Sequence, residues 1–171
     1  MVGSAMNNLT DAGIDGGSQE SIRQFRVFKR GDAKFAVTAD DVVTVAEWRR
    51  PTPLPHSPPA VLGVVSILGR MLTLLDPLVL LEGTSNENGS ERHIVALRGD
   101  EQLGLIVDET SDNLTAEISP LHDPAGSANL GVIKHEGDLI KVMDVNRLFS
   151  LAIRGRERRK RGFLSQGNEV Q

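Results

Sequence analysis

The 171-residue sequence contains no cysteine and no tyrosine, and its aromatic side chains are five phenylalanines and one tryptophan. The lack of cysteine excludes disulfide bonds, thiolate metal ligands and a cysteine nucleophile. An uncharged apolar run long enough to span a membrane is also lacking. The one candidate, residues 60–81, contains Arg70 and Asp76, each of which would cost about 2.5–3.5 kcal/mol near a bilayer centre. We therefore predict two buried strands there, 62–67 and 71–75.

Motifs for catalysis and for ligand binding are missing as well. The acidic run Asp108, Glu109 and Asp112 lacks the glycine and terminal glutamate of a calcium loop, so we interpret it as a solvated strand end. The segment GIDGG near the N-terminus is not followed by the Lys-Ser/Thr pair of a phosphate-binding loop. The histidines do not have the spacing of metal ligands; they are His56, His93, His122 and His135. We predict no enzyme activity, no cofactor, no metal and no small-molecule substrate.

The charge is unevenly distributed along the chain. The net charge is −4, but residues 154–161 (RGRERRKR) carry six basic side chains and one acidic one. The rest of the chain has 13 basic and 22 acidic side chains, a net charge of −9, and should repel nucleic acid and anionic lipid. We predict that residues 1–21 are a disordered leader and that residues 154–171 are a flexible basic tail. The tail suits either phosphate binding or the solvated end of a helix.

Short apolar runs separated by turn residues predict an all-β fold. We expect strands over 23–28, 34–38, 42–46, 62–67, 71–75, 92–97, 103–107, 130–134 and 139–143. The expected turns contain Arg30-Gly31-Asp32, Gly99-Asp100 and Glu136-Gly137, and five prolines between 51 and 59 exclude regular structure there. After Asp144, apolar residues at helical spacing predict a helix that Asp144 caps, and Asp76 with Pro77 forms an earlier start of the same kind.

The sequence carries a weak internal repeat. A single shift of 68 residues, without gaps, places Gly31-Asp32 over Gly99-Asp100, Gly63-Val64 over Gly131-Val132, and Asp76 over Asp144. Glycines at turns and aspartates at caps are the residues that backbone geometry would preserve after a duplication. We infer two similar β units of about 65 residues, each too small to be very stable alone and therefore expected to pack on the other.

These segments resemble the CheW-like domain of bacterial chemotaxis coupling proteins. Residues 52–59 (TPLPHSPP) are similar to the family's TPLPGAPP, and 61–69 (VLGVVSILG) to its V-x-G-V-I-N-L-R-G. Residues 107–114 (VDETSDNL) are similar to V-D-x-V-x-D/E-V-L. The resemblance covers residues 22–153, and it implies two small five-stranded SH3-like barrels packed together with a C-terminal helix.

The resemblance also implies a function. It predicts a cytoplasmic, non-enzymatic adaptor that binds the regulatory domain of a CheA-type histidine kinase and the cytoplasmic tip of a methyl-accepting chemoreceptor, and that meets the membrane only through the receptor. Contact residues carried over from matching motif positions are Val42, Thr44, Val45, Leu68, Arg92 and Asn113. The alternatives are a nucleic-acid-binding barrel that uses the Arg-rich tail, or a CheW-like protein that sequesters one partner.

Two of these positions depart from the family pattern. The family arginine of N-L-R-G is Leu68 here, and the family glutamate on the third strand is Thr44. If the two side chains face each other, losing both avoids leaving one charge unpaired. We therefore expect arginine restored at 68 alone to destabilise the fold more than glutamate at 44 and arginine at 68 restored together.

Overall fold

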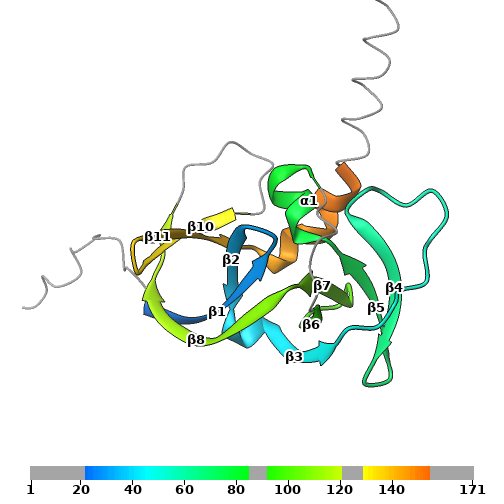
Figure 1. Ribbon diagram of the computed structural model, residues 1–171, viewed down its shortest axis with the longest axis horizontal. Helices are drawn as coiled ribbons and strands as arrows, with labels where there is room; N and C mark the ends of the chain where they lie inside the picture. Colours follow the sequence, from blue (N-terminus) through cyan, green and yellow to red (C-terminus); the bar gives the residue numbers. More distant parts are fainter. Residues whose placement is uncertain (1–21, 85–91, 121–128, 155–171) are drawn as a thin grey trace, which may run out of the picture.

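The computed structural model describes residues 22–84, 92–120 and 129–154, which form two curled β sheets with helices beside them (Figure 1). The first sheet has the order β8-β1-β2-β11-β10-β9, with bounds Glu109–Glu117, Ile22–Arg30, Ala33–Thr38, Asp138–Met143, Asn129–His135 and Ser119–Pro120. The second has the order β3-β6-β7-β5-β4, with bounds Val42–Glu47, His93–Leu97, Leu103–Val107, Arg70–Leu75 and Val61–Ile67. A 3-10 turn (Ala39–Asp41), α1 (Pro77–Glu82) and a helix over residues 145–154 complete the described chain.

Each sheet curls into a small SH3-like barrel, which we call the first and the second barrel. The predicted all-β class with two packed barrels and a C-terminal helix is thus confirmed, and the two-residue strand β9 adds a sixth member to the first sheet. The predicted leader 1–21 and the tail from residue 155 onward lie outside the described residues.

The repeat is visible in the strands, but its units are interleaved. Both bounds of β4 and β10 differ by 68 residues, and so do those of β5 and β11. Yet β1 and β2 pair with β8 and β11 in the first barrel, whereas β3, β4 and β5 share the second barrel with β6 and β7. Four pairs join the halves: the antiparallel pairs β1–β8 and β3–β6, and the parallel pairs β2–β11 and β5–β7. Each barrel therefore contains strands from both halves of the chain, and neither half forms a barrel of its own.

Gly63 and Gly131 occupy equivalent positions where one backbone crosses another. A Cβ atom on Gly63 would collide with the carbonyl of Thr52, and one on Gly131 with the carbonyl of Ser119. Thr52 bridges to Val64, and β9 pairs with β10 in the corresponding place. Only glycine permits this close approach, which explains why both copies of the repeat keep it.

Aspartates begin both helices, as the sequence predicts. Asp76 Oδ1 accepts a 3.0 Å hydrogen bond from the Leu78 amide, and Pro77 is the first helical residue. Asp144 Oδ1 accepts a 3.0 Å bond from the Asn146 amide in the same way. These bonds satisfy amides that have no carbonyl partner inside the helix.

Three apolar clusters form the core. One fills the second barrel, a smaller one fills the first, and the largest lies between them. The central cluster includes Phe28 and Phe35 from the first barrel, Leu75 and Leu105 from the second, and Leu148 from the C-terminal helix. Because the largest cluster is shared, we expect the two barrels to fold as one unit.

Three local assignments differ from the sequence prediction. Arg30, expected in a turn, is the last residue of β1 and is buried. Glu109 and Asp112, interpreted as part of a solvated strand end, lie within the nine-residue strand β8, which the sequence did not predict. Asp108, taken as part of that solvated end, is part-buried and bonds Arg30 Nη1 at 3.0 Å. The alternation typical of a half-buried strand is absent over Glu109–Asn113, where every side chain is exposed.

Candidate partner-binding surfaces

Strand β3 is an edge of the second barrel and holds three of the predicted contact residues. Val42 pairs with Leu97 and Thr44 with Ala96, so a bulge falls between them. Because of the bulge, Val42 and Val45 both pack against the central core cluster. The exposed apolar side chain of this strand is Val43, at 42% exposure, which the sequence reasoning did not single out.

Arg92 lies beside the end of β3. Glu47 pairs with His93 in the β3–β6 ladder. The residues next to this pair, Trp48 and Arg92, are also in contact, because the Arg92 guanidinium lies 5.5 Å from the ring centroid of Trp48. That distance is within the range of a cation–π contact. The next residue, Arg49, donates from Nη1 to the Ser66 carbonyl at 3.2 Å. This hydrogen bond brings the end of β3 close to the β4–β5 hairpin.

Leu68 lies at the tip of that hairpin and is 77% exposed. Leu68 and Gly69 have φ values of 50° and 75°, a left-handed turn that suits the twist of a two-residue hairpin. A leucine in this conformation costs roughly 1–2 kcal/mol relative to an ordinary backbone. Met71 adds a second exposed apolar side chain, at 57%.

The expected penalty for a lone arginine at 68 loses its basis here. At 77% exposure a guanidinium at this position would be hydrated, and the high cost of an unpaired charge applies to buried groups. Thr44 lies within β3, paired with Ala96 of β6.

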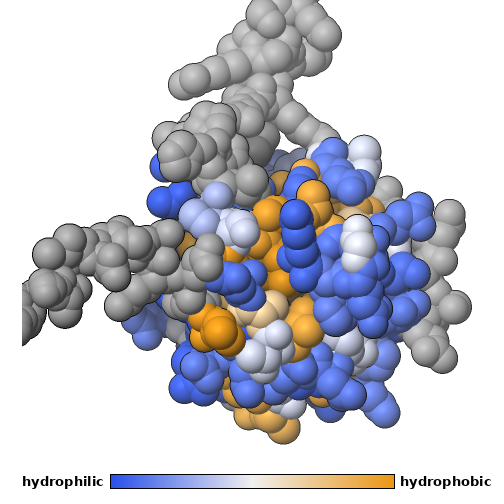
Figure 2. Space-filling model, turned by 90° about the vertical axis from the view of Figure 1, so that its left-hand side faces the viewer, coloured by the Kyte–Doolittle hydropathy of each residue, from blue (hydrophilic) through white to orange (hydrophobic). Residues whose placement is uncertain are grey.

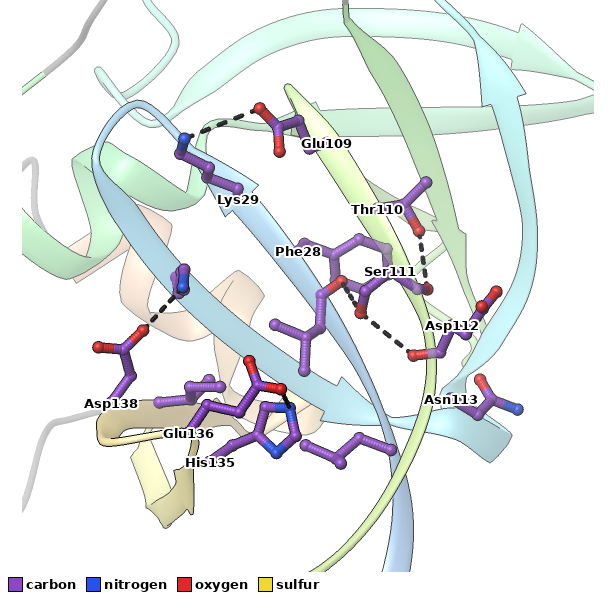
Figure 3. Close-up of a pocket in the computed structure, with 14 residues that line it drawn as sticks. Phe28, Lys29, Glu109, Thr110, Ser111, Asp112, Asn113, His135, Glu136 and Asp138 are labelled. Atoms are coloured by element: carbon purple, nitrogen blue, oxygen red, sulfur yellow. Dashed lines mark hydrogen bonds and ion pairs between the residues drawn. The ribbon is translucent and has the colours of Figure 1, made fainter.

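Asn113 lies apart from this region, on β8 of the first barrel. It lines a hollow of about 410 Å³ between β8 and the β10–β11 turn. Figure 3 shows residues of β8 on one side and His135 and Glu136 on the other, with Phe28 drawn close to Ser111 of β8. The apolar members of the lining are Val27, Phe28, Leu114 and Ile140. Figure 2, which views this side of the molecule, shows apolar surface framed by hydrophilic residues. The predicted contact residues thus divide between two barrels.

The rim of the hollow carries four carboxylates and two lysines. Lys34 Nζ lies 2.7 Å from Asp138 Oδ2, and Lys29 Nζ lies 3.7 Å from Glu109 Oε1. The hydrogen bond to Asp138 raises the pKa of Lys34, and the same bond lowers the pKa of Asp138. Glu136 has His135 at 3.9 Å, a cation only when protonated. Asp112 forms no ion pair with another described residue, so the rim is acidic.

A buried charge cluster joins the two barrels. Arg30 Nε and Nη2 donate to the two carboxylate oxygens of Asp76 at 3.2 and 3.0 Å, and Nη1 donates to Asp108 at 3.0 Å. The Gly31 amide donates to the other oxygen of Asp108 at 2.6 Å. Burial lowers the pKa of Arg30, but the hydrogen bonds and charges of both aspartates outweigh it, and the pKa is raised. This bonding marks the cluster as structural.

The described ranges contain no group of three or more histidine, aspartate or glutamate side chains that could hold a metal ion. Within the same ranges, no helix is long and apolar enough to span a bilayer. The apolar run 60–81 forms β4, β5 and most of α1, which agrees with the prediction of strands.

The interleaved double barrel defines a class of β-barrel domain. Similarity to known proteins identifies which class this is. Residues 24–153 match the family model of the CheW-like domain, and the chain belongs to that family. It is 34% identical over 136 residues to the chemotaxis protein CheW of Rhizobium meliloti. That alignment covers 74% of this chain and 87% of the Rhizobium meliloti protein. It is 24% identical over 128 residues to the chemotaxis protein CheW of Bacillus subtilis, covering 70% and 82%.

A solved structure has the same fold. The scaffolding protein TtCheW from Thermoanaerobacter tengcongensis superposes with a TM-score of 0.66 at 20% identity, over 75% of this chain and 93% of that one. The resemblance predicted from the sequence is therefore confirmed. The matched proteins give no support to the nucleic-acid alternative.

Proposed function

We propose that this protein is a cytoplasmic chemotaxis adaptor that couples the cytoplasmic tip of a chemoreceptor to the regulatory domain of a CheA-type histidine kinase. What supports this role most directly is the family match over residues 24–153, together with relatives that are named chemotaxis proteins. The role is docking and positioning, without bond chemistry.

The β4–β5 hairpin tip is the surface we assign to the kinase. Leu68 is exposed and also holds a costly left-handed backbone, although asparagine or glycine would relieve that cost. Strain that is kept at an exposed apolar residue points to a function for that residue. Leu68 and Met71, next to Arg49 and the Trp48–Arg92 pair, make an apolar tip beside cationic groups.

The remaining predicted contacts have other roles in this proposal. Thr44 and the exposed Val43 lie on the free edge of β3, where a partner can contact both backbone and side chain. Val42 and Val45 support that edge from the core side. Asn113 lies on β8 of the first barrel and would belong to a separate contact.

Binding measured by calorimetry tests the proposal. The full chain is titrated with the regulatory domain of a CheA-type kinase and, separately, with a receptor tip, each encoded near this gene. We expect binding to both. Absence of binding to both at high micromolar concentration would contradict the adaptor role.

Kinase output separates an adaptor from a sequestering protein. Receptor-containing vesicles, kinase and this chain are mixed, and kinase autophosphorylation is followed as the chain is added. An adaptor raises receptor-controlled phosphorylation up to a stoichiometric optimum. A protein that only sequesters one partner lowers phosphorylation at every concentration.

A further inference from the structure

The hollow on the first barrel and the basic tail are complementary in both charge and apolarity. The rim of the hollow has four carboxylates against two lysines, and its floor is apolar. Residues 156–161 (RERRKR) carry five basic side chains and one acidic one, and Phe163-Leu164 follows them after Gly162. The tail therefore combines a basic segment with an apolar one, and the hollow combines an acidic rim with an apolar floor.

The tail is also long enough to reach the hollow. Ile140 lines the hollow, and the chain between it and residue 154 consists of the end of β11 and a ten-residue helix. Those elements span at most about 30 Å. From residue 154 to Phe163 the extended chain covers another ~30 Å. The tail can therefore reach the hollow of its own molecule.

We propose that residues 156–164 of this chain occupy the hollow, with the arginines on its acidic rim and Phe163-Leu164 over the floor formed by Val27, Leu114 and Ile140. The rim gains cationic partners for Asp112 and Glu136, and the floor loses contact with water. The tail then competes with any partner that docks on this face. This inference stands independently of the adaptor role.

Paramagnetic relaxation in the full-length chain tests this placement. The natural sequence has no cysteine, so Ser165→Cys gives a single attachment site for a nitroxide label. In the ¹⁵N-labelled protein we expect the amide signals of Val27, Leu114 and Ile140 to broaden severalfold more than those of Leu68 and Met71. Raising salt from about 0.1 M to about 1 M shortens the screening length from ~10 Å to ~3 Å and should remove most of that broadening.

Charge variants provide the matched control. Asp112→Asn combined with Glu136→Gln removes two rim charges and should reduce the broadening severalfold. Asp100→Asn combined with Glu101→Gln removes two exposed charges from the β6–β7 turn and should leave it unchanged. Equal effects of the two pairs would show that the tail responds only to net charge, which contradicts the proposal.

Two further outcomes would overturn it. Selective broadening in a mixture of ¹⁵N-labelled, untagged chain with unlabelled, tagged chain would place the tail on a second copy. Absence of selective broadening, with tail-dependent binding of the protein to phosphatidylserine vesicles, would assign the tail to a membrane surface.

Discussion

Arg30 and Arg98 occupy equivalent positions of the repeat, 68 residues apart, but only Arg30 is enclosed. Arg30 is 4% exposed and donates to Asp76 and Asp108. Arg98 is exposed, and its Nε donates to the backbone carbonyl of Asp40 at 2.9 Å. The two copies have therefore diverged from a common turn into a buried clamp and a surface contact.

Replacement of Arg30 should be far more damaging than replacement of Arg98. Arg30→Met leaves the buried Asp76 and the part-buried Asp108 without their cation, which costs about 3–5 kcal/mol. Arg98→Met removes a surface contact worth under about 1 kcal/mol. Urea denaturation of both variants measures the difference. Similar losses of unfolding free energy would contradict a clamp at Arg30.

Leu68→Asn should separate stability from binding. Asparagine tolerates the left-handed conformation, so the variant should unfold at the same or a higher temperature. The free energy of unfolding should rise by up to about 1 kcal/mol. Its affinity for the kinase regulatory domain should fall at least tenfold, or about 1.4 kcal/mol. Thermal unfolding and calorimetry provide the two values.

Leu139→Asn is the control for the loss of an exposed apolar side chain. Leu139 is 63% exposed and lies on β11 of the other barrel, at the position equivalent to Met71. Its replacement should leave kinase affinity unchanged. If both variants bind equally weakly, the hairpin tip is not the specific contact.

The crossing at Gly63 should be intolerant of any side chain. Gly63→Ala places a Cβ against the Thr52 carbonyl at a φ of +140°, and we expect a loss of about 3 kcal/mol or more. Gly69→Ala meets open space at a φ of +75° and should cost only about 1 kcal/mol. A Gly63→Ala protein as stable as Gly69→Ala would contradict the close approach.

Ionisation of Asp41 should lower the free energy of unfolding as pH rises. Burial, followed by the charges of Asp144 and Asp40, raises the pKa of Asp41. A raised carboxyl pKa means that the folded state resists deprotonation, so the penalty is absent below the ordinary aspartate pKa and complete above the folded value. Asp41→Asn should therefore raise the unfolding temperature slightly at pH 7 and leave it unchanged at pH 3.

Asp138 provides a comparison of opposite sign. Its pKa is lowered by the hydrogen bond from Lys34, so its contribution is present at neutral pH and disappears as pH falls through the folded value. Asp138→Asn should lower the unfolding temperature slightly at pH 7. Scanning calorimetry over pH 3–7 distinguishes the two aspartates, and shifts of the same sign would contradict both assignments.

Local chemistry explains which parts of the fold could be predicted. The β4–β5 hairpin and both helix starts depend on glycine, proline and aspartate within a few residues, and those signals are readable in the sequence. Strand β8 could not be read in this way, because its first five side chains are exposed and its partner β1 lies about 85 residues away. The interleaving depends on four pairings between the halves, β1–β8, β2–β11, β3–β6 and β5–β7, that no local pattern encodes.

The candidate site was predictable to a similar extent. The motif resemblance selected Leu68, which is exposed, and Arg92, which stacks on Trp48. Simple alternation could not place Val42 and Val45, because the bulge at Val43 turns both toward the core. The hollow beside Asn113 requires β8 and the β10–β11 turn to meet, which is again a long-range relationship.

The interleaving also fixes an order of events during synthesis. The second barrel needs residues only up to Val107, whereas the first waits for β10 and β11, which end at Met143. Strands β1 and β2 therefore leave the ribosome first and find their last partners late. Until then their apolar faces, including Phe25 and Phe35, have no complete barrel to enter. A nascent chain that ends before β10 would therefore expose the apolar faces of the β1–β2 hairpin to chaperones.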